Sequence, residues 1–211
     1  MKGKFIVIEG IDGSGKTTQI NQLSKWINEA NIIPQNNQLV LTREPGGTQL
    51  GKSIRTLLLD PSREISLNSI TELLLYAADR AQHVNEIIRP SLTKGDWVIS
   101  DRFCGSTLAY QGYGRKLDIK LIKDLEAIAT QGISPDITFL LDIPVDESIK
   151  RRESETDDRI EKEGREFLSN VSQGFQILSE QNKWKKISAL NTKEHIISEI
   201  KSEIENLLKQ K

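Results

Sequence analysis

The sequence contains few cysteine, histidine and aromatic residues. Of its 211 residues, one is cysteine, two are histidine and 5% are aromatic. Cys104 alone cannot form an internal disulfide, and with His83 and His195 it offers no histidine and cysteine cluster of the kind that binds zinc. A single cysteine favours a reducing compartment, so we expect a cytoplasmic protein.

Neither sign of charge is in marked excess. The chain has 29 lysines and arginines against 30 aspartates and glutamates, a net charge of -1. This balance argues against nucleic acid or an anionic membrane as a partner. A core-like strand begins almost at the N-terminus, and no apolar stretch approaches the length that crosses a bilayer, so neither export nor membrane anchoring is expected.

Short apolar runs alternate with longer segments of helical periodicity, which predicts an α/β fold with a parallel sheet. We expect a three-layer αβα arrangement, with helices on both faces of a five-stranded sheet, in one domain spanning residues 1–211. The predicted strands are the apolar runs at 5–8, 39–41, 97–99, 137–141 and 187–190.

Helical periodicity is clearest between the second and third runs. There the apolar residues step by three and four, which predicts one long amphipathic helix that ends at Pro90. Its predicted stripe consists of Ile70, Leu73, Leu74, Ala77, Ala81, Val84 and Ile88. Further helices are predicted around 121–128, 167–178 and 196–208, and the strongly charged stretch 150–166 is predicted to be a mobile lid.

One segment matches a phosphate-binding motif, the P-loop, at every defined position. It follows the first apolar run, and small residues there let backbone N–H groups converge on phosphate oxygens. We therefore expect a nucleoside triphosphate site with Mg²⁺ held by the Thr17 hydroxyl at the start of the next helix. The predicted triphosphate-binding residues are Gly10, Ile11, Asp12, Gly13, Ser14, Gly15, Lys16, Thr17 and Thr18.

Charged residues follow the other predicted strands, where ligands of open parallel sheets bind. Arg43 follows the second run and could hold an acceptor phosphate, and Asp101 and Arg102 follow the third. Asp101 is placed to order Mg²⁺ or to cap a helix, and the two roles are compatible. Because phosphoryl transfer mainly needs placement and positive charge, Lys16 and Arg102 are candidate catalytic residues.

Beyond the P-loop, the chain resembles the thymidylate kinases. The resemblance rests on the P-loop with Asp12, on Thr42-Arg43-Glu44-Pro45-Gly46-Gly47-Thr48, on Leu75-Tyr76-Ala77-Ala78-Asp79-Arg80, and on a block from Asp101-Arg102-Phe103 through Ser106-Thr107-Leu108-Ala109-Tyr110-Gln111-Gly112. It implies a P-loop NTPase fold, ATP and Mg²⁺ as cofactors, phosphorylation of dTMP to dTDP, and a homodimer.

The resemblance also implies roles for single residues. Tyr76 would stack on thymine and Arg80 would bond the carbonyl edge of the base, whereas the family usually has phenylalanine at the position of Tyr76. The remaining roles concern the base, the sugar and the acceptor pocket: Thr107 and Gln111 would meet the base, Tyr110 would crowd the sugar 2′ position, Asp12 would approach the 3′-OH, and Arg55 would lie near the acceptor pocket.

Gly13 is informative because one branch of the family has an arginine inside the P-loop. The other branch takes its catalytic arginine from the lid, which here contains Arg151, Arg152 and Arg159. Arg151 and Arg159 are the favoured candidates for this catalytic arginine, and the sequence does not rank one above the other.

Two other functions are compatible with a P-loop. The same chemistry could act on another nucleoside monophosphate or on a deoxynucleoside, but the arginine-bearing loop 43–48 and the spacing of Thr107, Tyr110 and Gln111 argue against this. A P-loop switch protein would need a base-reading motif such as Asn-Lys-x-Asp for guanine, and the sequence has none.

Overall fold

A computed structural model describes residues 3–62, 67–153 and 158–209, and within them the strands form a five-stranded parallel sheet. The order across the sheet is β2-β3-β1-β4-β5. This confirms the predicted fold class. The strands are β1 (Phe5–Glu9), β2 (Leu39–Arg43), β3 (Trp97–Asp101), β4 (Ile137–Asp142) and β5 (Lys185–Ser188).

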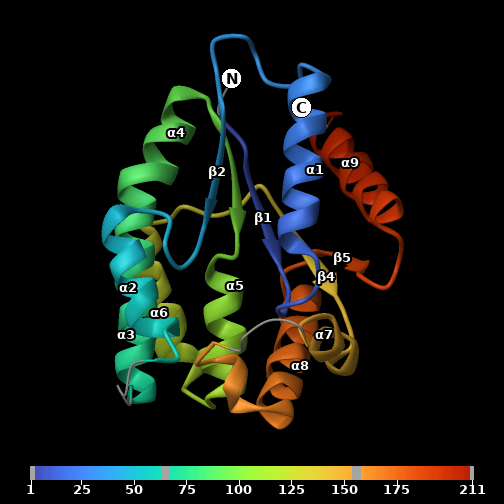
Figure 1. The fold of residues 1–211 in the computed structure, drawn as a ribbon. Coiled ribbons are helices and arrows are strands. Elements are labelled where there is room, and N and C mark those ends of the chain that lie inside the picture. The colour runs from blue at the N-terminus through green and yellow to red at the C-terminus, as the bar shows by residue number, and fades with distance from the viewer. Residues whose placement is uncertain (1–2, 63–66, 154–157, 210–211) are drawn as a thin grey trace.

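Helices cover both faces of the sheet, as Figure 1 shows for α1 and α9 on one side and α4 on the other. Alternating side chains of β1 serve the two faces, because successive strand residues point in opposite directions. Ile6 and Ile8 join a buried cluster with α1 and α9, whereas Phe5 and Val7 pack on the opposite side. The α-helices are α1 (Lys16–Glu29), α2 (Gln49–Leu59), α3 (Ser69–His83), α4 (Arg89–Lys94), α5 (Cys104–Thr107), α6 (Ile119–Thr130), α7 (Val145–Arg151), α8 (Arg165–Gln181) and α9 (Lys193–Lys209).

Two predicted boundaries were wrong. Pro90 does not end the long helix, because a π-helical segment, η1 (Val84–Ile88), joins α3 to α4 and places Pro90 in the first turn of α4. Pro90 therefore lies inside a continuous helical path, and the π-helical turn directly before it takes up the backbone distortion that a proline causes. The last strand lies two residues earlier than 187–190. It is an edge strand in which only Ile187 is buried, so it carries a weak apolar signal.

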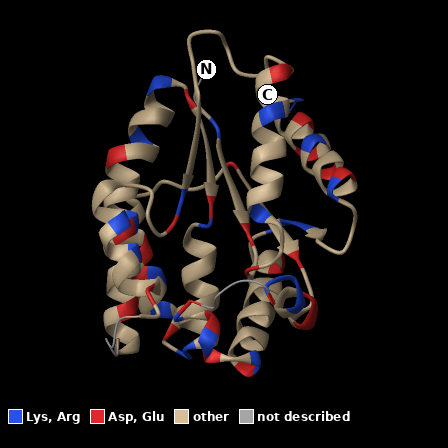
Figure 2. Ribbon diagram, viewed as in Figure 1, with Lys and Arg blue, Asp and Glu red and all other residues tan. Residues whose placement is uncertain are grey.

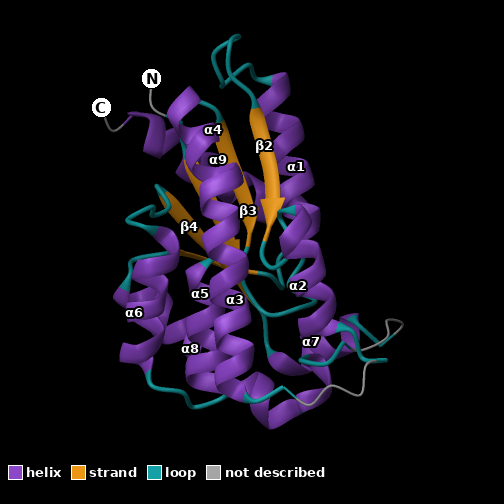
Figure 3. Ribbon diagram, turned by 90° about the vertical axis from the view of Figure 1, so that its left-hand side faces the viewer, coloured by secondary structure: helices purple, strands orange, loops and turns teal. Residues whose placement is uncertain are grey.

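The predicted apolar stripe on α3 was only partly right. Leu73 and Ala77 are buried, but Ile70 and Leu74 are 41% and 49% exposed. Figure 3 shows α3 across the front of the sheet between α2 and α6, which pack against its sides. Ile70 and Leu74 therefore lie on the outer surface of this helical layer.

The carboxyl ends of β1, β2 and β3 meet at one edge of the sheet, and the segments that follow them bear most of the candidate residues. Figure 2 shows basic and acidic residues interleaved in the loops and helices beyond this edge. Two further single-turn segments belong to this region, the π-helical η2 (Leu108–Gly114) and the 3₁₀-helical η3 (Glu161–Glu163). Among the described helices, none is long and apolar enough to cross a membrane.

Candidate active site

The P-loop forms the turn between β1 and α1, and its glycines adopt backbone conformations that other residues disfavour. Gly10, Gly13 and Gly15 have φ values of 143°, 75° and 90°. A Cβ atom on Gly13 would lie 2.8 Å from the carbonyl oxygen of Ser148 in α7. A side chain at position 13 would therefore collide with α7 as it lies in this structure.

A cavity opens between the P-loop and the segments near the lid, and we call it the P-loop cavity. Lys16 is 7% exposed, and its Nζ donates to the carbonyl oxygens of Gly10 and Ile11 at 3.1 Å each. Burial and the nearby Arg102 lower the pKa of Lys16. The cavity is lined by Asp12, Gly13, Gly15, Lys16, Thr17, Thr18, Arg43, Glu44, Arg55, Asp101, Arg102, Arg151, Arg152, Asp158 and Glu161. Of the predicted triphosphate residues, Gly10, Ile11 and Ser14 lie outside this lining.

The oxygen atoms near Lys16 are suitable ligands for a magnesium ion. Thr17 and Asp101 both line the P-loop cavity, and the buried Oδ1 of Asp101 has no hydrogen-bond partner among the described residues. Asp101 does not cap α5, which begins at Cys104 after Phe103. The described residues contain no group of three or more His, Cys, Asp or Glu side chains that could hold a metal. Mg²⁺ suits such a site, since it keeps several waters and binds through few protein ligands together with substrate phosphates.

Arg102 and Asp12 form the centre of the site. Arg102 donates from Nη2 to Asp12 Oδ1 at 2.6 Å, and from Nη1 to the carbonyl oxygen of Gly10 at 2.9 Å and to Ser106 Oγ at 3.0 Å. Burial alone would raise the pKa of Asp12, but the positive charges of Arg102 and Lys16 outweigh it and hold this pKa far below its usual range. Asp12 therefore stays ionised next to a paired guanidinium.

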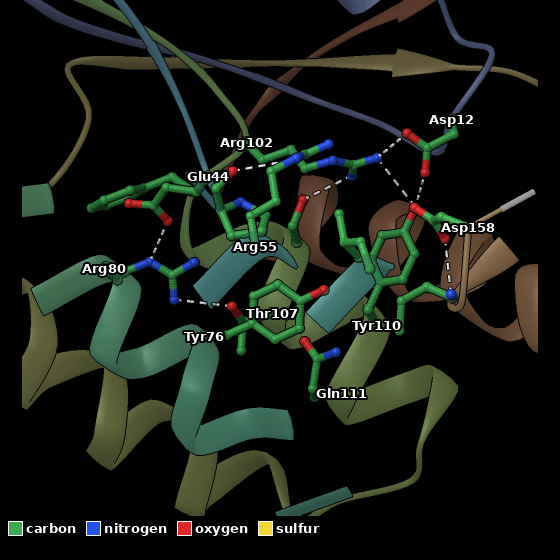
Figure 4. Close-up of a pocket in the computed structure, with 15 residues that line it drawn as sticks. Asp12, Glu44, Arg55, Tyr76, Arg80, Arg102, Thr107, Tyr110, Gln111 and Asp158 are labelled. Carbon is green, nitrogen blue, oxygen red and sulfur yellow. Dashed lines mark hydrogen bonds and ion pairs between the residues drawn. The ribbon is translucent and has the colours of Figure 1, made fainter. Parts of the chain in front are cut away.

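A second, more enclosed cavity, the inner pocket, lies on the other side of Arg102 (Figure 4). Tyr76 from α3 and Tyr110 from η2 present rings to it, and the Tyr110 hydroxyl donates to Asp12 Oδ2 at 3.2 Å. The pocket is lined by Asp12, Glu44, Pro45, Arg55, Leu59, Tyr76, Arg80, Arg102, Phe103, Ser106, Thr107, Tyr110, Gln111, Asp158 and Ile160.

Arg80 is more deeply buried than helical spacing suggests. Arg80 lines the inner pocket together with Tyr76, one helical turn away, but it is only 1% exposed. Its Nε donates to Glu44 at 2.7 Å, and its Nη1 bonds Thr107 at 2.9 Å and also pairs with Glu126. A guanidinium is tolerated in the interior only when its charge is paired, and here two carboxylates pair it at the wall of the inner pocket.

Asp79 fixes the loop that follows β2 and offers a test by pH. It accepts from the backbone N–H of Gly46 at 3.1 Å and is 1% exposed. Burial, aided by the Glu44 carboxylate, raises the pKa of Asp79 from 3.8 to about 6.

We therefore expect the free energy of unfolding to fall as pH rises from about 4 to about 7, because the folded protein retains on Asp79 a proton that the unfolded chain has released. A pKa raised from 3.8 to about 6 corresponds to a loss of about 3 kcal/mol in the free energy of unfolding over this pH range. Asp79→Asn should remove this contribution, as shown by urea unfolding at pH 4 and pH 7. An identical pH dependence in both proteins would contradict the assignment.

The predicted lid, residues 150–166, includes 154–157, which lie outside the described residues. Arg151 and Arg152 line the P-loop cavity, and Arg151 donates to the carbonyl oxygens of Gly13 at 3.4 Å and of Ala189 at 3.0 Å. Arg159 instead lies against α2 and α3, where its Nε donates to the carbonyl oxygen of Leu58 at 2.6 Å. The structure thus brings two of the three lid arginines to the P-loop cavity.

Arg43 and Arg55 extend the positive charge along this edge. Arg43 is exposed and lines the P-loop cavity, whereas Arg55 lines both cavities and donates from Nη1 to the carbonyl oxygen of Pro45 at 3.0 Å. Arg55 at the junction of the two cavities, with Arg43 on the P-loop side of it, suits an anionic group lying between them.

Sequence reasoning missed Glu9, the last residue of β1. It is 1% exposed and accepts from the backbone N–H groups of Phe103 and Ser106 at 3.0 and 3.2 Å and from Ser106 Oγ at 2.6 Å. Burial raises the pKa of Glu9 to about 7. A carboxylate that ends an apolar strand and directly precedes the P-loop was the available signal. Through Ser106, Glu9 supports the loop that presents Arg102.

These features define a class of protein. A P-loop with a paired lysine, a carboxylate and hydroxyl suited to Mg²⁺, and two cavities that meet at Asp12 and Arg102 are the components of a P-loop phosphotransferase that brings together a nucleoside triphosphate and a smaller acceptor.

Comparison with known proteins identifies the family. The family model for thymidylate kinase matches residues 8–200. A thymidylate kinase of Prochlorococcus marinus strain NATL1A is 80% identical over 211 residues, which is all of both chains. Another from strain AS9601 is 54% identical over 206 residues and covers 98% of this chain and 97% of its own length. The crystal structure of thymidylate kinase from Ehrlichia chaffeensis aligns with a TM-score of 0.75 at 38% identity, covering 96% of this chain and 99% of that one. The chain belongs to the thymidylate kinase family.

Proposed function

We propose that this enzyme binds ATP with Mg²⁺ in the P-loop cavity and dTMP in the inner pocket. As a member of the thymidylate kinase family it phosphorylates dTMP to dTDP, a step of dTTP synthesis. The observation that carries the site assignment is the shared wall of the two cavities, since both are lined by Asp12, Glu44, Arg55, Arg102 and Asp158. An acceptor phosphate in one cavity and a terminal phosphate in the other would meet there in line.

The two ends of the site would have different tasks. Lys16, Arg102 and Arg151 would stabilise charge on the transferring phosphoryl group, with Mg²⁺ held from Thr17 and Asp101 neutralising charge on ATP. Arg151 is favoured over Arg159 because it bonds the P-loop at Gly13, whereas Arg159 is bound to Leu58. A catalytic role for Arg159 would require it to leave that position.

The inner pocket would hold the nucleoside. Tyr76 would stack on the base, Arg80, Thr107 and Gln111 would face the polar edges of the base, and Tyr110 with Asp12 would border the sugar. The Tyr110 ring lies in contact with Arg102, whose guanidinium carbon is 5.2 Å from the ring centroid. Arg43 and Arg55 would bind the acceptor phosphate at the junction.

The Tyr76→Ala variant tests this arrangement. We expect its KM for dTMP to rise about tenfold or more while the KM for ATP changes little, because the ring lines only the inner pocket. Tyr76→Phe is the matched control and should keep the KM for dTMP, since it removes the hydroxyl alone. Equal rises of both KM values in Tyr76→Ala would show that Tyr76 supports the structure instead of the base.

We further propose a homodimer formed by the layer of α2, α3 and α6 that faces the viewer in Figure 3. Apolar side chains are exposed on all three helices: Leu50, Leu57, Ile70, Leu74, Leu121 and Ile128, at 51%, 36%, 41%, 49%, 40% and 72%. An apolar surface of this kind indicates a protein interface. The single cysteine of the sequence, which is free, and the substrates support a cytoplasmic location.

Placing a charged side chain on this apolar surface tests the dimer. Ile128→Glu should weaken self-association by roughly a hundredfold or more, as measured by sedimentation, because it places an unpaired charge in the interface. Leu208→Glu, at a 36% exposed leucine of α9, is the control and should leave association unchanged. A monomeric wild-type protein would refute the proposal.

A further inference from the structure

Glu72 is a buried carboxylate that touches the inner pocket only through another residue. It lies on α3 and is 0% exposed. Its Oε1 accepts from Gln111 Nε2 at 2.8 Å and from Arg115 Nε at 3.3 Å, and its Oε2 accepts from Arg115 Nη2 at 3.1 Å and from Arg159 Nη2. Glu72 is absent from the lining of both cavities, whereas Gln111 lines the inner pocket.

The contact with Glu72 determines which way the Gln111 amide faces. An ionised carboxylate can only accept hydrogen bonds, so the amide must turn its NH₂ group toward Glu72. Gln111 is itself 1% exposed, and its Nε2 is committed to the hydrogen bond with Glu72, which leaves its Oε1 for another partner. Figure 4 shows the Gln111 side chain pointing toward Tyr76 within the pocket. The pocket therefore meets a carbonyl oxygen, an acceptor, at this point.

The arginines keep Glu72 in its acceptor state. Burial alone would raise the pKa of Glu72, but hydrogen bonds from Arg115, Gln111 and Arg159 outweigh burial and lower it. Arg115 is held in turn by Glu163 at 2.6 Å. A protonated Glu72 could donate to Gln111 and allow the amide to reverse, and this network prevents that.

We propose that Glu72 is a positioning residue that fixes the Gln111 amide so that the inner pocket selects pyrimidines carrying a hydrogen on N3. Thymine and uracil have this N–H, which donates to the Gln111 oxygen. Cytosine has an unprotonated N3, which would place two acceptors face to face and leave both without a partner. The inference rests on the proposed binding of the dTMP base in the inner pocket.

The test compares kcat/KM for dTMP, dUMP and dCMP in wild type and in Glu72→Gln. The introduced amide offers both a donor and an acceptor, so the Gln111 amide is free to reverse and present its NH₂ group to N3 of cytosine. The ratio of kcat/KM for dTMP over dCMP should fall about tenfold or more. The ratio for dTMP over dUMP should stay the same, because these bases share the imide and differ at the 5-methyl group. An unchanged ratio of dTMP over dCMP would overturn the proposal.

Two further variants separate positioning from structural support. In Gln111→Leu, the amide is lost, and the ratio of dTMP over dCMP should fall; adding Glu72→Gln to it should lower that ratio no further, because Glu72 acts through Gln111. Independent losses that multiply would overturn the proposal. Glu163→Gln, the control, removes the charge of the other carboxylate that pairs with Arg115, without touching Gln111, and should keep the wild-type ratio.

Gln111→Leu also separates a failure of the proposed dTMP site from a failure of the proposed role of Glu72. If dTMP binds elsewhere, this variant leaves the KM for dTMP unchanged, and the proposed site fails together with the inference. If its KM for dTMP rises while Glu72→Gln keeps the wild-type ratio of dTMP over dCMP, the site stands and the role of Glu72 is refuted. The first measurement needs only Gln111→Leu, so it decides the site assignment by itself, whereas the role of Glu72 is decided by the ratio of dTMP over dCMP in Glu72→Gln.

Discussion

Lys16→Met is expected to lower kcat by roughly 10³-fold while the protein remains folded. The ammonium group is held at the P-loop by the carbonyl oxygens of Gly10 and Ile11 and lies 3.6 Å from Asp12 Oδ1. A charge fixed in advance beside the transferring phosphoryl group stabilises the transition state without reorganisation, and loss of one such group commonly costs roughly 10²- to 10³-fold. Methionine keeps most of the apolar stem in place, so packing changes little.

The decisive measurement is steady-state kcat with saturating dTMP and ATP, together with thermal unfolding. Because burying an ammonium group is itself costly, the variant should unfold at a temperature close to that of the wild type. Lys25→Met is the matched control on the same helix. Lys25 is 76% exposed and pairs only with Glu29 at 3.8 Å among the described residues, so kcat should be unaffected. A kcat within tenfold of wild type in Lys16→Met would exclude Lys16 from catalysis.

The sheet and the P-loop could be predicted because their signals are local. The motif occupies eight consecutive residues, and its glycines, lysine and hydroxyl follow a fully buried strand. Strand runs of three to five largely apolar residues in β1, β3 and β4 are typical of a parallel sheet covered on both faces. The one displaced strand, β5, lies at the sheet edge and has a single buried residue, so the apolar run misses its start.

The buried charge networks could not be predicted, since their partners are distant in sequence. Arg80 pairs with carboxylates 36 and 46 residues away, and Glu72 binds arginines and an amide 39 to 87 residues away. Helical spacing alone places a lone arginine toward solvent, because its burial is favourable only once two specific carboxylates lie beside it. Glu72 and Glu126 therefore carry no local sequence signal of their burial. Which lid arginine acts in catalysis remains a prediction for the same reason.

Arg102→Ala should lower kcat/KM for dTMP by roughly 10³-fold, and Arg102→Lys should recover little of it. The guanidinium bonds four oxygen atoms, those of Gly10, Ser106, Asp12 and Tyr110, and Arg102 lines both cavities. An ammonium group carries the charge but lacks the planar fork, so it cannot keep these contacts and also meet a phosphate. Arg89→Lys is the matched control, because Arg89 bonds only Gln131 among the described residues and lies outside both cavities.

The pH profile shows whether Arg102 also acts through Asp12. In the wild type, Arg102 and Lys16 hold the pKa of Asp12 far below its usual range, so Asp12 stays ionised throughout the neutral and mildly acidic range. Without Arg102, burial is opposed by Lys16 and the Tyr110 hydrogen bond, and the pKa of Asp12 must rise. If ionised Asp12 is needed to accept from the sugar 3′-OH, the acid limb of kcat/KM for dTMP moves to higher pH in Arg102→Ala. Asp12→Asn should abolish this displacement, and in the double variant the two losses should combine to less than their product, because the residues share one ion pair. An acid limb at the same pH in wild type and Arg102→Ala would show that Arg102 serves the phosphates alone.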